Sequence, residues 1–187
     1  MLIGDEVGTH TLIKKSAPRV CPVCLVEDRR QDDRFGGAGH VAWNIISIHR
    51  CHLHGAELMT LVTELPHMKG YDLHPIIRNN WPLIEERAAT PTEGKPETSL
   101  EHYLRRRIAG FVPGIWADGL PLYVVARTAE MLGCRMLFGP KQLFRRLTSD
   151  QMREAGAAGF GALSGGPDQL RETLRSFERS TQEPRPF

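Results

Sequence analysis

The sequence lacks the features of a membrane-spanning or secreted chain. No apolar run approaches the ~18 residues that a membrane helix needs, and residues 1–10 show no basic stretch followed by an apolar core, the mark of a secretory signal. Only four cysteines are present, and disulfide frameworks belong mainly to small secreted domains. From these absences we predict a cytoplasmic protein with reduced thiols and no membrane partner.

A strong excess of charge is also missing, since the formal net charge is +2 at pH 7. The distribution is less even, because residues 98–153 contain nine Lys/Arg and four Asp/Glu. A basic middle on a near-neutral chain permits contact with nucleic acid without requiring it. With 187 residues, 41% of them hydrophobic, the chain suffices for one ordinary globular domain or for a small metal module plus a helical domain.

No catalytic spacing stands out in the sequence. The histidines are scattered, and Cys134 follows Gly133 in apolar surroundings, which is typical of a core residue. The Gly-rich run 156–166 lacks the Gly-Lys-Ser/Thr ending of a phosphate-binding loop. We therefore predict close helix packing and turns for that run, and nothing in the sequence has the spacing of a catalytic cluster.

Two short half-sites form the most informative pattern. Cys21–Cys24 reads CPVC and Cys51–His54 reads CHLH, and two such turns can supply four ligands to one tetrahedral ion. A disulfide and plain buried thiols are the alternatives; the missing secretory signal disfavours the first, and the CPxC and CxxH spacing disfavours the second. His52 competes with His54, and the CxxH spacing favours His54. The set predicted to hold one structural Zn²⁺ is Cys21, Cys24, Cys51 and His54; four protein ligands leave no open position for catalysis.

The fold class predicted from this pattern is mainly α, with a small zinc-ribbon β module followed by a helical domain. We expect the zinc module over 1–88, a linker over 88–96, the helical domain over 97–180 and a frayed tail over 181–187. Within the module we expect a loop over 27–39, a short strand over 40–49, and over 57–63 either a returning strand or a short helix.

Capping and punctuation residues predict the helices. Over 72–87 a helix is expected to be broken or kinked by Pro82. Thr98 with Glu101, and Thr148 with Gln151, fit capping boxes. The other expected helices are 122–132 with Gly133 as its C-terminal stop, 141–147 after Pro140, one from Thr148 into the 156–161 region, and one starting at Pro167 and Asp168.

Two basic clusters are candidates for contact with DNA phosphates. The first comprises Arg105, Arg106 and Arg107, which also fit a solvated face near a helix C-terminus. The second comprises Lys141, Arg145 and Arg146, after the helix expected over 122–132. Helix, glycine turn and basic helix is the outline of a helix-turn-helix. A plain helical hairpin fits the same residues, so both interpretations stay open.

The pattern CPxCLxxD, a later Trp and CxxHGxxL resembles the TniQ family of DNA transposition proteins, which includes TnsD-like proteins. The matching positions are Cys21–Asp28, Trp43 and Cys51–Leu58. Many members carry another CPxC soon after the CxxH; this chain has Leu65–Met68 (LPHM) there, so we expect one zinc ion. The resemblance extends over most of the chain through similar helical segments at 103–110, 127–133 and 155–163.

This resemblance implies a non-enzymatic accessory role in transposition. Such proteins help to select target DNA by linking a target-recognition element to an AAA+ ATPase of the transposon. The implied partners are that ATPase and DNA, bound directly or through a targeting complex, and a homodimer stays open. The alternatives are a zinc-stabilised transcriptional regulator that binds DNA through residues 121–147, and a metal-dependent hydrolase.

Overall fold

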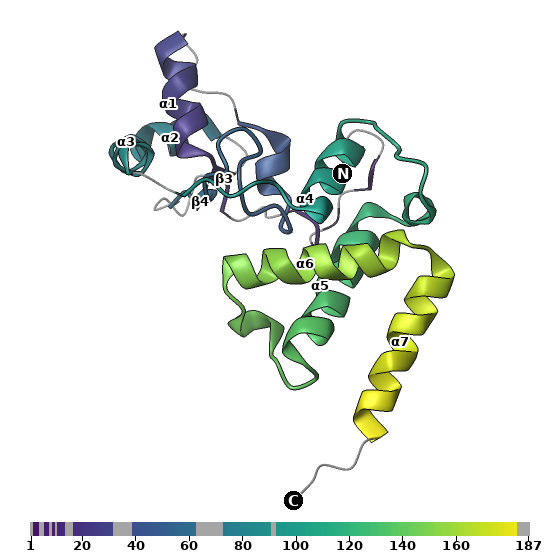
Figure 1. Ribbon diagram of the computed structural model, residues 1–187. Helices are drawn as coiled ribbons and strands as arrows, with labels where there is room; N and C mark the ends of the chain where they lie inside the picture. The colour runs from purple at the N-terminus through teal and green to yellow at the C-terminus, as the bar shows by residue number, and fades with distance from the viewer. Residues whose placement is uncertain are drawn as a thin grey trace, which may run out of the picture. The chain divides into compact units, whose positions relative to one another are not determined.

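The computed structural model describes residues 2–3, 6–7, 9, 11–13, 17–31, 39–62, 73–90 and 93–182. The chain divides into two compact units, residues 1–97 and residues 98–187. The described part is mainly helical, with very short strands and a Cys/His cluster in the first unit. None of its helices combines the length and the apolar character needed to cross a membrane. Figure 1 shows the elements of each unit.

The first unit is built around one small antiparallel strand pair. Strand β3 pairs with β4, with Arg19 opposite Thr60 and Val20 opposite Met59, and a separate pair joins β1 to β2. Between β3 and β4 the chain forms a helix and a 3₁₀ turn, and two further helices follow. The elements are β1 (Leu2–Ile3), β2 (Glu6–Val7), β3 (Arg19–Val20), α1 (Pro22–Gln31), η1 (Val41–Asn44), β4 (Met59–Thr60), α2 (Leu73–Asn79) and α3 (Trp81–Ala89).

Two expectations for the first unit are wrong. Residues 27–31 are not loop, because α1 starts at Pro22, whose missing N–H costs nothing at a helix start, and carries in its last turn Arg29 and Arg30, which complement the helix dipole. Residues 32–38 of the expected loop lie outside the described residues. The stretch 40–49 is not a strand: it contains η1 and, among the described residues, only an isolated bridge at Ile45. Ile45 and Ile48 of this stretch are buried in the core without belonging to a ladder, and Val41 is exposed.

Later boundaries of this unit follow the sequence more closely. The expected break at Pro82 falls between α2 and α3, with Pro82 in the first turn of α3. Asn80 occupies the break, where its side-chain amide bonds the backbone N–H and C=O of Val62 at 3.2 and 3.0 Å. Residues 93–96 of the expected linker belong to the first unit, and Lys95 donates its N–H to Gly55. The Leu65–Met68 segment lies outside the described residues.

The second unit is helical. Its elements are α4 (Ser99–Ile108), η2 (Trp116–Gly119), α5 (Leu122–Phe138), η3 (Phe144–Arg146), α6 (Ser149–Ser164) and α7 (Pro167–Gln182). Both predicted capping boxes are present, at the starts of α4 and α6. The start of α7 at Pro167 also agrees with the sequence, and α7 includes residues 181–182 of the expected tail; residues 183–187 lie outside the described part.

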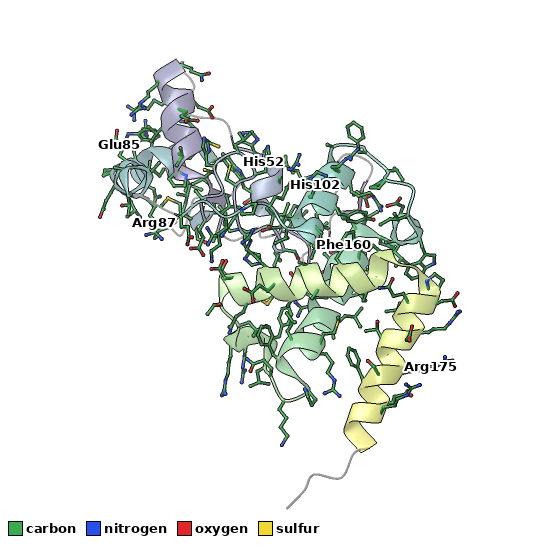
Figure 2. All side chains as sticks on the ribbon, in the orientation of Figure 1. His52, Glu85, Arg87, His102, Phe160 and Arg175 are labelled. Atoms are coloured by element: carbon green, nitrogen blue, oxygen red, sulfur yellow. The ribbon has the colours of Figure 1, made fainter. Side chains whose placement is uncertain are left out.

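The predicted end of α5 at Gly133 is wrong. Helix α5 continues to Phe138, and α6 crosses it (Figure 1). A Cβ on Gly133 would lie 1.7 Å from the carbonyl oxygen of Ala155, and one on Gly159 would lie 1.8 Å from that of Ala129. The glycines therefore let two backbones touch, which confirms that the Gly-rich run packs helices closely. Phe160 of α6, labelled in Figure 2, is buried and its ring lies 4.8 Å from that of Tyr103.

The helix expected over 141–147 is also wrong in extent. Only one 3₁₀ turn, Phe144–Arg146, forms there, and the turn expected at Gly133 starts instead at Gly139 (φ 78°). The guanidinium of Arg127 lies 4.0 Å above the Phe144 ring, which holds this 3₁₀ turn against α5. Cys134 is buried, as predicted for a core residue.

Candidate metal centre

The four predicted ligands converge on one point of the first unit. Their donor atoms all lie within 4.8 Å of one another. Sγ of Cys24 lies 3.5 Å from Sγ of Cys51 and 3.3 Å from Nδ1 of His54. Nδ1 of His54 also lies 3.7 Å from Cys21 Sγ and 3.8 Å from Cys51 Sγ. A tetrahedron with Zn–S of about 2.3 Å and Zn–N of about 2.0 Å has edges of about 3.5–3.8 Å, so the donor set fits one such ion.

Two local structures place these donors. Cys21 immediately precedes α1 and Cys24 lies in its first turn, so the CPVC segment supplies one thiol on each side of a helix start. The Cys51–His54 segment is a tight turn closed by a hydrogen bond of 2.8 Å from the Gly55 N–H to the Cys51 carbonyl. Gly55 has φ of 62°, and a Cβ there would lie 2.8 Å from the backbone of Lys95. Only glycine suits this position.

An acidic residue orients the histidine. Oε2 of Glu27, on α1, lies 3.0 Å from Nε2 of His54. Since Nε2 donates to this carboxylate, the lone pair of the neutral imidazole is on Nδ1, which faces the three sulfurs. A carboxylate that holds the second nitrogen of a ligand histidine is a common feature of metal sites. Glu27 was not among the predicted site residues, because the charged sequence after Cys24 indicated a loop; its position three residues after Cys24 in a helix was the available signal.

The pKa shifts of the three thiols are also consistent with a cation-binding site. Hydrogen bonds to Cys21 and Cys51, together with burial, raise the pKa of Cys24. Hydrogen bonds from Cys21 and Cys24 lower the pKa of Cys51. The hydrogen bonds among the three thiols thus favour ionisation of one of them, and burial with these hydrogen bonds opposes ionisation of Cys24. A bound cation would supply a positive charge and hold all three sulfurs as thiolates.

The four donor residues are largely shielded from solvent. All three cysteines are buried and His54 is half-buried, whereas the rival ligand His52 is exposed and outside the cluster.

The apolar positions of the CPxCLxxD, Trp and CxxHGxxL pattern contribute to the core. Leu25, Trp43 and Leu58 are buried core residues of the first unit.

The predicted DNA-contacting residues lie in the second unit and differ in environment. Lys141, Arg145 and Arg146 are exposed, the latter two on η3. Arg105 and Arg106 are half-exposed in the last turn of α4. Arg105 contacts His102, and the guanidinium of Arg106 lies 4.7 Å from the Phe111 ring centre.

Arg107 is the exception among these residues. It is 7% exposed, and its Nη1 donates to the Tyr103 hydroxyl at 2.6 Å and to Asp118 Oδ1 at 3.4 Å. Asp118 also accepts the N–H groups of Gly114 and Ile115 at 2.7 and 2.8 Å. The guanidinium of Arg107 is thus used inside the fold, to hold the 110–118 loop on α4, and is not presented to a ligand.

Comparison of the chain with known protein families, with curated proteins and with solved structures found no match.

Proposed function

We propose that Cys21, Cys24, Cys51 and His54 bind one Zn²⁺ that is structural. The support is the set of donor distances, the burial of the three thiols and the chemistry of three sulfurs with one imidazole, a set that suits zinc. Four protein donors surrounding one ion leave no position for a reacting water. This favours a structural role over the hydrolase alternative.

We propose further that the chain is an accessory protein of DNA transposition, related to the TniQ family. The observation that supports this best is the agreement between the sequence pattern and the structure of the first unit. Besides the four donors, Leu25, Trp43 and Leu58 of the pattern are buried in the core of the first unit, and Gly55 closes the Cys51–His54 turn. The pattern therefore describes one folded module, which is the part most similar to TniQ proteins.

In this role the zinc module is a rigid docking surface for an AAA+ transposition ATPase. The first unit has a core of short elements and strands of two residues each, and a metal ion that joins α1 to the Cys51–His54 turn would stabilise it. Target DNA, where it is contacted directly, binds the exposed cations of the second unit, Lys141, Arg145 and Arg146; otherwise it is reached through a targeting complex. Arg107 is left out of that set because its charge is paired internally.

A pull-down against an AAA+ transposition ATPase tests the proposal. We expect the wild-type chain to capture the ATPase. The variant Cys24→Ser should lose zinc and capture together, whereas Cys134→Ser, a buried thiol of the second unit, should keep both. If zinc is bound but no ATPase is captured, the transposition role fails while the metal assignment stands. If capture is independent of zinc, the docking surface lies elsewhere.

A further inference from the structure

The last helix carries an apolar stripe that its own unit leaves partly uncovered. Leu170, Leu174 and Phe177 recur at spacings of four and three on α7, which places them on one face. Leu174 is 46% exposed. Among the described elements, α7 packs mainly on α6, and Figure 1 shows it extending away from that helix beyond the 165–166 turn.

Helix α5 extends this surface. The guanidinium of Arg135 on α5 lies 5.4 Å from the centre of the Phe177 ring, so the stripe faces the α5 side. Met131, one helical turn before Arg135 on the same face, is 58% exposed. Leu174 on α7 and Met131 on α5 are thus both exposed apolar side chains, and the Arg135–Phe177 contact joins the two helices beside them.

The charges beside the stripe are arranged for pairing with an identical helix. If Leu170 and Phe177 are taken as d positions and Leu174 as the a position between them, Arg171 and Glu178 both fall at e, along the same side of the stripe. The residue at g on the other side is Thr173. One edge of the stripe thus carries one positive and one negative charge, seven residues apart, and Thr173 on the other edge is uncharged.

We propose that two copies of this chain associate through antiparallel pairing of their α7 helices. When Leu174 of one copy packs beside Phe177 of the second, the antiparallel geometry brings e positions together, and Arg171 lies opposite Glu178 of the second copy. Two-fold symmetry repeats this ion pair at the other end. In a parallel pair, Glu178 would meet Thr173 instead, with no opposite charge. The sequence therefore favours the antiparallel arrangement.

The contacts that Arg171 makes within one chain do not oppose this. Arg171 forms an i,i+3 ion pair with Asp168, both exposed, and such pairs contribute little to stability. Arg175, labelled in Figure 2, lies on the side of α7 away from α5 and α6 and is exposed. It stays in solvent in the dimer and provides a control.

The length of α7 limits the size of the proposed interface. Since α7 has 16 residues, the interface is at the small end for specific complexes, and we expect micromolar association.

Sedimentation equilibrium of the full chain over a wide micromolar concentration range tests the proposal. We expect a monomer–dimer equilibrium that Leu174→Glu weakens at least about tenfold, with unchanged far-UV circular dichroism. Arg175→Glu, also a change to Glu on α7, should leave it unchanged. A chain that stays monomeric at every concentration, or a dimer unaffected by Leu174→Glu, would overturn the proposal.

Charge exchange tests the antiparallel register. Arg171→Glu and Glu178→Arg should each weaken the dimer, and the double variant should restore it, because the two charges then meet with their signs exchanged. These changes lie on the exposed edge of α7 and do not touch the core, so they remain informative if Leu174→Glu perturbs the helix. A double variant no better than the single ones would overturn the antiparallel pairing. Neither test involves the metal or an ATPase, so their outcome is independent of the proposed transposition role.

Discussion

Glu27 and His54 form a hydrogen-bonded pair that determines which nitrogen faces the thiols. The carboxylate oxygen and Nε2 are 3.0 Å apart, and Nδ1 is the atom within 3.3–3.8 Å of the three sulfurs. The two residues come from separate elements, the helix that carries Cys24 and the turn that follows Cys51. Their contact therefore joins the two half-sites even before a metal is considered.

The pair predicts a defect in metal affinity for Glu27→Ala. Without the carboxylate, the imidazole loses its fixed orientation and tautomer, and loss of the hydrogen bond to the second nitrogen of a ligand histidine costs about 10- to 100-fold in affinity. Competition with a chelator of known affinity measures the change. Glu85→Ala is the matched control, because Glu85 lies on α3 at the same groove as Glu27 and is exposed. Equal affinities of the wild type and Glu27→Ala would contradict the assigned role of Glu27.

Metal removal should unfold the first unit and spare the second. The two units have separate cores, and a short-stranded module with a structural zinc depends on the ion for its stability. We expect one zinc per chain by elemental analysis. After chelation, hydrogen exchange should show loss of amide protection over residues 19–61 and little change over α4 to α6. Full retention of protection in residues 19–61 would show that the metal is dispensable.

The sequence predicted the Cys/His cluster well and the backbone around it less well. Spacing alone identified Cys24 and His54, because a ligand pair in a tight turn is a local property. The helical state of residues 27–31 depends on Pro22 at the start of α1 and on Arg29 and Arg30 in its last turn. Because this helix was not predicted, the role of Glu27 beside His54 was not predicted either. Likewise, Gly133 obeys a local rule for a helix end, but the contact with Ala155 from a distant helix determines its place. Contacts between residues that are distant in the sequence cannot be predicted from the residue type at one position.

The helix crossing of the second unit predicts opposite effects for two glycines of α6. Gly159→Ala would place a Cβ 1.8 Å from the Ala129 carbonyl oxygen, which forces α5 and α6 apart and should destabilise the unit by about 1–3 kcal/mol. Gly161→Ala meets no atom within 4 Å and should stabilise the helix by up to about 1 kcal/mol. Urea unfolding followed by circular dichroism measures both. A neutral Gly159→Ala would contradict the close crossing.

The buried pair of Arg107 and Asp118 predicts a pH-dependent contribution to stability. Burial opposes ionisation of Asp118, but hydrogen bonds from the Ile115 N–H, the Tyr103 hydroxyl and the Gly114 N–H, with the charge of Arg107, hold its pKa below the ordinary value. Replacing Asp118 with Asn leaves the buried guanidinium without a counter-charge, which should cost about 3 kcal/mol at neutral pH.

The sign of the pH dependence follows from the lowered pKa. The unfolded carboxyl titrates near about 3.9, so the contribution of Asp118 is complete above that pH and is lost as the pH falls through the lower folded-state pKa. The difference in unfolding free energy between the wild type and Asp118→Asn should be constant above about pH 5 and shrink below about pH 4. Chemical unfolding at several pH values measures it. A difference that grows on acidification would contradict the assigned pKa direction.

Charge reversal tests the exposed cations that we propose for DNA. Arg145 and Arg146 lie side by side on η3 and are exposed, so the double change to Glu should weaken binding to duplex DNA and lower the slope of log affinity against log salt by about 1.8, the value for two lost phosphate contacts. Reversal of Arg175 and Arg179, two exposed arginines of α7, changes the net charge equally and is the matched control. An equal loss in both double variants would indicate a general charge effect and would contradict a localised site. Absence of binding by the wild type would instead leave docking to a protein partner as the function of this unit, because the buried Arg107 cannot replace the exposed pair.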